Sequence, residues 1–346
     1  MKAFKRWQGL LRWIVTLGAL AYFVSRVDVR ELAAHVVAAE LRWIAFSVTL
    51  SVGVIIFMGL RWRCVLRACD LQVPLSQTVS VTFIGQFFNS FLPGSTGGDI
   101  VKAWYATKWA PERKAAPVIS IFYDRLTAIV TLLMATTVVL GVQAASRPDL
   151  RWLFARFLLL GSGVAIAAGF LAAVARTFRS KLPQIVGGDH PIQQFCRTHF
   201  GNCRFSTNAL NEFSAAVVVS VAAHLLNVTA AWGIARAVHL EVGFLQLAVA
   251  VAFVNFSSVL PISIGGHGVR EAGFVFIFTL YNIIPRGGAH DAVMENVLAF
   301  SLLLFARSLM SSLPGGLCYT IFRRERGSAA PAAIPQSFSC AEGSIS

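Results

Sequence analysis

The sequence predicts an all-α integral membrane protein, because of its composition, its long apolar runs and a motif that occurs twice. Of the 346 residues, 56% are hydrophobic and only 13% are charged, whereas about a quarter of the residues in a soluble domain are charged. The mean hydropathy is +0.67, and no alternating pattern typical of a membrane β-barrel is present. We expect about six to eight transmembrane helices plus one or two re-entrant hairpins, with an internal, inverted repeat.

Apolar runs long enough for helices follow one another along the chain, and no linker divides them. They occupy residues 9–25, 43–60, 76–92, 117–144, 151–175, 213–238, 243–260, 269–284 and 292–321. The first run follows a basic start but is not followed by a small-x-small cleavage site, so we expect a retained helix rather than a signal peptide. Residues 1–322 are predicted to form one polytopic domain, and residues 323–346, rich in Ser, Pro and Ala, a short disordered cytoplasmic tail.

The basic residues predict the orientation in the membrane. The net charge of +14 would suggest nucleic acid in a soluble protein, but here the basic residues lie mostly between apolar runs. The N-terminus, residues 61–75, residues 176–212 and the tail each carry an excess of Lys and Arg. The positive-inside rule places all four in the cytoplasm. We therefore expect an inner-membrane protein with both termini cytoplasmic, in contact with anionic lipid headgroups and not with nucleic acid.

One topology satisfies these charges. Residues 76–110 enter from the cytoplasm, turn and return, and residues 243–284 enter from the opposite face, turn and return. The two segments then form re-entrant hairpins of opposite orientation. Two full crossings for 243–284 fit the charges equally well, so this alternative stays open.

The turn of each hairpin carries the same motif. Residues 92–98 read LPGSTGG and residues 260–266 read LPISIGG. At an offset of 168, six of eleven positions are identical, and Lys102 matches Arg270. The identical residues are Leu92, Pro93, Ser95, Gly97, Gly98 and Val101 in the first copy, and Leu260, Pro261, Ser263, Gly265, Gly266 and Val269 in the second. Internal repeats in a membrane chain suggest duplicated halves, a common transporter design.

The motif suggests an anion site. Proline and paired glycines break a helix and allow tight turns, and broken backbone at membrane depth needs protein or water around it. The Gly-Gly pair then opens a short helix whose N-terminal N–H groups favour an anion such as a phosphate. Lys102 and Arg270 follow one turn later, and Asp99 and Glu271 lie beside them. The alternative is that the motif only forms a close-packed hairpin.

Ionisable residues inside apolar runs are further candidates. Asp124, Arg125 and Arg307 lie within such runs, and Glu271 begins a returning helix. Charges at this depth are costly unless they are paired or hydrated, so substrate binding is the first hypothesis. Asp124 and Arg125 cannot face each other on one helix. We expect Arg125 to point to Glu271 or a lipid phosphate, and Asp124 to point to Lys102 or Arg307. The alternative is that ion pairs only fasten helices together.

Other polar residues suggest no metal, cofactor or catalytic centre. Cys196, His199 and Cys203 do not have the spacing of a zinc site, and no common catalytic motif occurs in a suitable context, so we expect no enzyme. The polar residues within apolar runs predict hydrogen bonds between helices; they are Gln86, Asn89, His224, Asn227 and Asn255.

Three stretches together resemble one known family. QFFNSFLPGSTGGDIVKAWY, IFYDRLTAI and VLPISIGGHGVREAG are similar to the transmembrane domain of lysylphosphatidylglycerol synthase/flippase proteins, over about residues 5–322. The resemblance implies a multi-pass inner-membrane protein that moves a lipid with a polar headgroup between leaflets. It implies a phospholipid, a glycolipid, a polyprenyl-linked sugar or a hopanoid as cargo. The shared positions are Pro93, Gly97, Gly98, Asp99, Lys102, Asp124, Arg125, Pro261, Gly265, Gly266, Arg270 and Glu271.

The chain departs from the family in two places. Full-length synthases add a soluble aminoacyltransferase domain, but only 24 residues follow Phe322, so lysine transfer from tRNA is not expected. His267 stands where a small or apolar residue is expected, opposite Asp99 of the first copy.

The sequence therefore predicts a lipid translocase. A headgroup phosphate would bind between the two hairpins through Lys102, Arg125 and Arg270, with Asp124 and Glu271 as candidates for proton coupling. One alternative is a membrane-embedded transferase that acts on a lipid-phosphate donor, with Asp99 or Asp124 as its base. Another is a non-transporting partner of a separate lipid or glycolipid synthase.

Overall fold

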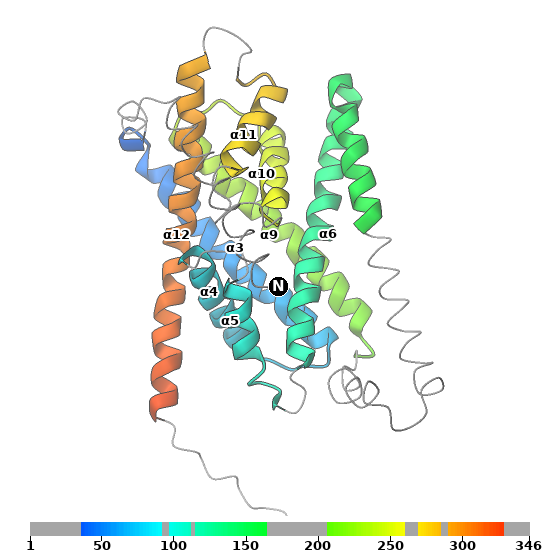
Figure 1. The fold of residues 1–346 in the computed structure, drawn as a ribbon, viewed down its shortest axis with the longest axis vertical. Helices are drawn as coiled ribbons and strands as arrows, with labels where there is room; N and C mark the ends of the chain where they lie inside the picture. Colours follow the sequence, from blue (N-terminus) through cyan, green and yellow to red (C-terminus); the bar gives the residue numbers. More distant parts are fainter. Residues whose placement is uncertain are drawn as a thin grey trace, which may run out of the picture.

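The computed structural model describes residues 36–91, 97–111, 115–164, 206–259, 269–284 and 290–328, and the regular secondary structure of this part of the chain is entirely helical (Figure 1). Four helices are long and apolar enough to cross a membrane, which confirms the predicted class. The named helices are α3 (Leu41–Ala68), α4 (Leu75–Phe91), α5 (Gly97–Ala106), α6 (Ala115–Ser146), the short 3₁₀ helix η2 (Pro148–Leu150), α9 (Ala209–Ala237), α10 (Phe244–Val259), α11 (Val269–Leu280) and α12 (His290–Ser328). Residues 151–164 form a further helical stretch.

The helices repeat along the chain in two sets of four. A long helix, a hairpin of two short helices and a second long helix make up each set: α3 to α6 in the first, and α9 to α12 in the second. The first two helices of the second set begin 168 and 169 residues after their counterparts. The offset of the repeated motif therefore extends to whole helices, as expected for duplicated halves.

The two halves run in opposite directions. The backbone N–H of Glu40, before α3, donates to the carbonyl of Ala237 at the end of α9, with 3.1 Å between N and O. The N–H of Ser206, before α9, donates to the carbonyl of Ala68 at the end of α3 over 3.0 Å. Each helix thus begins where the other ends, and Figure 1 shows both running obliquely through the molecule. The repeat is inverted.

The two hairpins open on opposite sides. Leu71 before α4, Tyr105 in α5 and Ala116 in α6 pack in one apolar cluster, on the lower side in Figure 1. On the upper side, the Gln143 amide near the end of α6 donates to the carbonyl of Leu245 in α10, and Tyr281 after α11 donates to Gln143 Oε1. The predicted opposite orientation of the hairpins agrees with this arrangement.

The second helix of each hairpin is too short to cross a bilayer. α5 has 10 residues and α11 has 12, which correspond to about 15 and 18 Å of helix, against about 30 Å of hydrocarbon. α10, with 16 residues, reaches about 24 Å. Residues 243–284 were compatible with a re-entrant hairpin or with two full crossings, and these helix lengths favour the re-entrant hairpin.

The described residues form two apolar clusters, one within the first half and a larger one that both halves share. Trp62, Leu66, Ile84 and Tyr105 are fully or almost fully buried between α3, α4 and α5. Phe274, Phe278 and Phe300 form the centre of a larger cluster that α11 and α12 share with α6, α9 and α10. The ring centroids of Phe274 and Phe300 lie 5.1 Å apart in an edge-to-face arrangement, which favours aromatic packing.

Two predicted boundaries require correction or extension. Residues 61–68, expected in a basic loop, belong to α3, because Trp62, Val65 and Leu66 continue its buried face. α12 extends through Ser328, past the predicted start of the tail at residue 323. The predicted helix 9–25 and most of the basic segment 176–212 lie outside the described residues.

Candidate functional site

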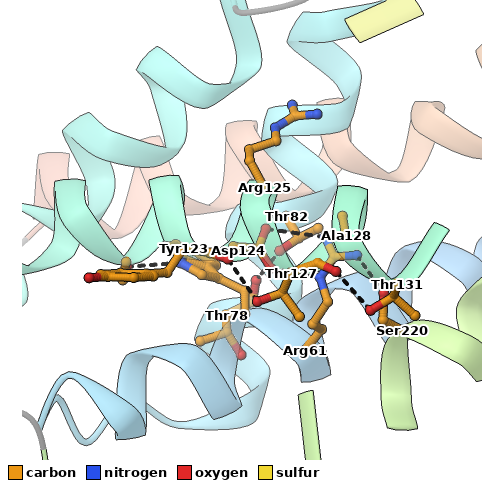
Figure 2. Close-up of polar contacts among 12 residues, drawn as sticks. Arg61, Thr78, Thr82, Tyr123, Asp124, Arg125, Thr127, Ala128, Thr131 and Ser220 are labelled. Atoms are coloured by element: carbon orange, nitrogen blue, oxygen red, sulfur yellow. Dashed lines mark hydrogen bonds and ion pairs between the residues drawn. The ribbon is translucent and has the colours of Figure 1, made fainter. Parts of the chain in front are cut away.

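A buried ion pair joins two helices of the first half and also contacts one helix of the second half. Arg61 in α3 donates from Nε to Asp124 Oδ1 over 2.8 Å and from Nη2 to Asp124 Oδ2 over 3.2 Å. Its Nη1 donates to Ser220 Oγ of α9 over 3.4 Å. The side chains of Arg61 and Asp124 are only 5% and 3% exposed. Figure 2 shows Arg61 lying between Asp124 and Ser220. This two-fold contact gives the pair a fixed geometry.

Lys102 of the first repeat joins the same group. Its Nζ lies 3.7 Å from Asp124 Oδ2 and 4.3 Å from the centre of the Trp62 ring. The indole N–H of Trp62 donates to Ser120 Oγ over 3.1 Å, which orients the ring. Lys102 is buried, so both the carboxylate and the aromatic face stabilise its charge.

Arg125 faces away from this group. Its Nε and Nη2 donate to the two carboxylate oxygens of Asp99 over 2.8 and 2.9 Å. In Figure 2 its side chain points away from Arg61 and Asp124, as expected for neighbours on one helix. The Arg125 side chain is 46% exposed. The pair therefore lies at the edge of the site and joins α6 to the start of α5.

The beginning of α5 is tied to α4. The N–H of Gly98 donates to Asn89 Oδ1 over 2.7 Å, as predicted for Asn89 as a residue that hydrogen-bonds between helices. A side chain at Gly98 would overlap the Gly85 carbonyl oxygen, so only glycine allows this approach. Asp99 occupies the first turn of α5. One of the N-terminal N–H groups predicted to face an anion, that of Gly98, thus already donates to an amide oxygen of the protein.

The second half has a separate charged group. Arg270, the counterpart of Lys102, donates from Nη2 to Glu271 Oε1 over 2.8 Å and from Nε to Ser301 Oγ over 3.0 Å. Ser301 donates to the same Glu271 oxygen over 2.9 Å. The guanidinium of Arg270 also lies over the ring of Phe305, 5.6 Å from its centre. These contacts join the start of α11 to the middle of α12.

Arg307 lies further along α12 than Ser301. Its Nη2 donates to Asn227 Oδ1 of α9 over 3.0 Å. Its Nε and Nη1 are buried, and among the described residues they have no hydrogen-bond partner. The described residues therefore accept hydrogen bonds from only part of the Arg307 guanidinium.

The predicted pairings are partly correct. Asp124 does lie near Lys102, but its closer partner is Arg61, and Arg307 contacts Asn227 instead. The expected contact between Arg125 and Glu271 is wrong. Instead, Arg125 pairs with Asp99 and Glu271 pairs with Arg270, and each pair lies within one half of the molecule. The candidates at the turns of the hairpins lie outside the described residues: Pro93, Ser95, Pro261, Ser263, Gly265 and Gly266, with His267.

Sequence reasoning missed Arg61, Ser220 and Ser301. Arg61 was assigned to a basic loop, although Met58, Trp62, Val65 and Leu66 continue the helical spacing of apolar residues across it. That spacing is the signal that an arginine lies inside a helix. Ser220 and Ser301 are small residues in apolar helices and give no signal of their own.

Two further observations limit the chemistry of the site. Within the described ranges, no group of His, Cys, Asp and Glu could hold a metal ion. A pocket of about 570 Å³ lies near Glu40, Trp43, Arg236 and Glu241, at the upper ends of α3 and α9. None of the residues that line this pocket belongs to either charged group, so the pocket is separate from the candidate site.

The inverted repeat, the half-length hairpins and the apolar spans define a polytopic all-α membrane protein. The family described as "Lysylphosphatidylglycerol synthase TM region" matches residues 9–315. The chain belongs to this family, which confirms the resemblance and indicates a role connected with membrane lipids. A comparison with curated proteins gave no match.

Proposed function

We propose that this protein moves a lipid with a polar headgroup between the leaflets of the bacterial inner membrane. The observation that carries the proposal is the pair of inverted hairpins, each with a cation near the start of its second helix: Lys102 in α5 and Arg270 in α11. In an inverted repeat, the two halves have opposite orientations. A site between them can therefore open first to one side of the membrane and then to the other. The family match supports a lipid as the cargo.

In this proposal, the headgroup phosphate passes between the two charged groups while the acyl or prenyl chains remain in the lipid. Lys102, Arg125 and Arg270 would attract it, and Asp99, Asp124 and Glu271 would hold these cations in place when it is absent. Charge-assisted hydrogen bonds to a phosphate compensate for the loss of its hydration. Asp124 and Glu271 remain the candidates for proton coupling, because both carboxylates lie inside the bundle.

The transferase alternative has less support from the site. It needs Asp99 or Asp124 as a free base, but each of these carboxylates accepts two hydrogen bonds from one guanidinium. Such an arrangement is typical of a fixed ion pair. We therefore propose a non-enzymatic role.

The test is leaflet exchange in proteoliposomes. Fluorescent phosphatidylglycerol, phosphatidylethanolamine and a polyprenyl phosphate are each incorporated, and a membrane-impermeant quencher reports the fraction that changes leaflet. We expect the wild-type protein to accelerate exchange of at least one lipid, and Lys102→Ala and Arg270→Ala to slow it at least tenfold. Lys108→Ala is the matched control, because Lys108 is exposed and stacks on Trp104 outside both groups.

Exchange no faster than in empty vesicles for every lipid would contradict the proposal. Equal rates for the wild type and the two site variants would leave exchange in place but contradict the site. Conversion of a lipid-phosphate donor to a new product by the purified protein would support the transferase instead.

A further inference from the structure

Arg307 occupies the middle of a membrane-spanning helix. The apolar span within α12 extends from Glu295 to Ile321, and Arg307 lies close to its centre. Its Nη2 has one partner, Asn227 Oδ1 at 3.0 Å. Its Nε and Nη1 are buried and, within the part of the chain that the structure describes, lack an acceptor. These two nitrogens carry three of the five N–H donors of a guanidinium.

The nearest charges do not compensate Arg307. The neighbouring charged residue is Arg270, which has the same sign and whose guanidinium lies over the ring of Phe305, two residues before Arg307 in α12. Glu271, the carboxylate of this group, accepts hydrogen bonds from Arg270 and Ser301 over 2.8 and 2.9 Å. The next acidic residue on the same helix, Glu295, is about 18 Å away along the axis. Among the described residues, no carboxylate therefore pairs with Arg307.

The first half of the molecule offers a contrast. There, Arg61 binds both oxygens of Asp124, and Arg125 binds both oxygens of Asp99. Lys102 lies against Trp62 and Asp124. All three cations in that half have a counter-charge or an aromatic face. An uncompensated charge at mid-membrane depth is costly, and where it occurs it commonly marks a place where a ligand supplies the missing charge.

We propose that Arg307, with Arg270 beside it, binds the phosphodiester of a lipid headgroup at the middle of the membrane. A phosphodiester carries one negative charge and two free oxygens, which match one uncompensated guanidinium with unused donors. This inference rests on the proposed function and makes it more specific. It adds Arg307 to the charged group of the second half and assigns the bound position of the anion to that half, beside the path between the two charged groups.

The first experiment measures binding. The protein, purified in a neutral detergent, is melted while its tryptophan fluorescence is followed, with dioctanoyl phosphatidylglycerol, dioctanoylglycerol or inorganic phosphate added. We expect the phospholipid to raise the melting temperature of the wild type in a dose-dependent way, and dioctanoylglycerol, which has the same chains without phosphate, to have little effect. Arg307→Gln should weaken this binding at least tenfold, and Arg307→Lys should weaken it less.

Arg156→Gln is the matched control. Arg156 is exposed on the helical stretch 151–164, where its guanidinium lies over Trp152. This variant loses an arginine from the same protein without touching the site, so it should bind the phospholipid as the wild type does.

The second readout is stability without added lipid. If Arg307 is an unoccupied anion receptor, Arg307→Gln removes an uncompensated charge, and its ligand-free melting temperature should equal or exceed that of the wild type. A purely structural arginine would give the opposite result, a clear decrease.

Three results would overturn the inference. They are a wild type that the phospholipid does not stabilise, an Arg307→Gln variant that binds it as tightly as the wild type, and inorganic phosphate that stabilises as strongly as the lipid. The last result would assign the site to a free anion. The proposed function is judged separately. Binding lost in Arg307→Gln, together with a wild type that gives no leaflet exchange, supports this site and contradicts translocation.

Discussion

At the scale of single residues, the buried ion pair between Arg61 and Asp124 is the most constrained feature of the first half. Both side chains are almost completely buried, and each supplies the partner that the other needs. Removal of one partner from a buried pair leaves an uncompensated charge, whereas replacement of both by apolar residues is often neutral.

We therefore expect Asp124→Asn to reduce the free energy of unfolding by about 3–5 kcal/mol, because it leaves Arg61 and Lys102 without their carboxylate. The measurement is equilibrium unfolding in mixed detergent micelles with increasing dodecyl sulfate. The double variant Arg61→Met with Asp124→Leu should recover the part of the loss that is due to Arg61, because Lys102 remains without a carboxylate.

Asp99→Asn is the comparison for this prediction. It breaks the other arginine–carboxylate pair, whose Arg125 side chain is 46% exposed, so the expected loss is below about 1 kcal/mol. Equal losses for Asp124→Asn and Asp99→Asn would show that burial does not govern these pairs.

Sequence reasoning found most of these charged residues but predicted only part of their pairing. An acid or base inside an apolar run is conspicuous, so Asp124, Arg125, Glu271 and Arg307 were identified. Their partners depend on which helix faces lie together, and one sequence does not contain that information. Arg125 binds Asp99 because α5 returns alongside α6, a contact that only the folded hairpin creates.

At the scale of elements, the hairpin of α4 and α5 depends on a close approach of two backbones. Gly85 and Gly98 face each other, and the N–H of Gly98 donates to Asn89. Small residues at such contacts allow the helices to approach and increase packing in the membrane. The repeated Gly-Gly pair thus has a packing role in the first half, beside any role in binding.

A methyl group at Gly98 should disturb this hairpin. Because the new Cβ would overlap the Gly85 carbonyl, we expect Gly98→Ala to reduce the free energy of unfolding by about 1–3 kcal/mol. Gly163→Ala is the control, since no atom lies within 4 Å of a Cβ at Gly163, and it should be neutral or slightly stabilising. Both variants can be compared by thermal melting in detergent, and similar melting temperatures would contradict the contact.

The helices themselves were largely predictable. Eight of the nine expected runs contain described helices that start or end within a few residues of the expected positions, because apolar length is the dominant signal in a membrane sequence. The main difference is at α3, because the charged residues at its end lie in the helix and not in the predicted loop 61–75. A charge excludes a residue from lipid but not from a helix that packs against other protein.

At the scale of the whole molecule, the inverted repeat predicts where each hairpin opens. Lys108 follows α5 and Glu241 precedes α10, and both are exposed. The hairpins to which these two helices belong open on opposite sides of the bundle. In a background without cysteine, Lys108→Cys and Glu241→Cys should react with a membrane-impermeant maleimide from opposite sides. The positive-inside rule predicts that Lys108 is cytoplasmic. Labelling of both from the same side would contradict the opposed hairpins.

The motif offset of 168 residues predicted this arrangement, and the structure extends it from eleven positions to eight helices. The choice between a re-entrant hairpin and two crossings for 243–284 could not be made from charge, because both place the same loops on the same sides. Helix length favours the first, since α11 is too short to span.

The pairing of α3 with α9 also bears on how the molecule arose. Arg61, Arg63 and Arg67 occupy the last turns of α3, and at the same offset α9 has Thr229, Ala231 and Ala235. An ancestral unit with few such charges could enter the membrane either way up, and two copies could then meet head to tail. In the present chain, the arginines at the end of α3 place that end on the cytoplasmic side by the positive-inside rule, so each half keeps one orientation.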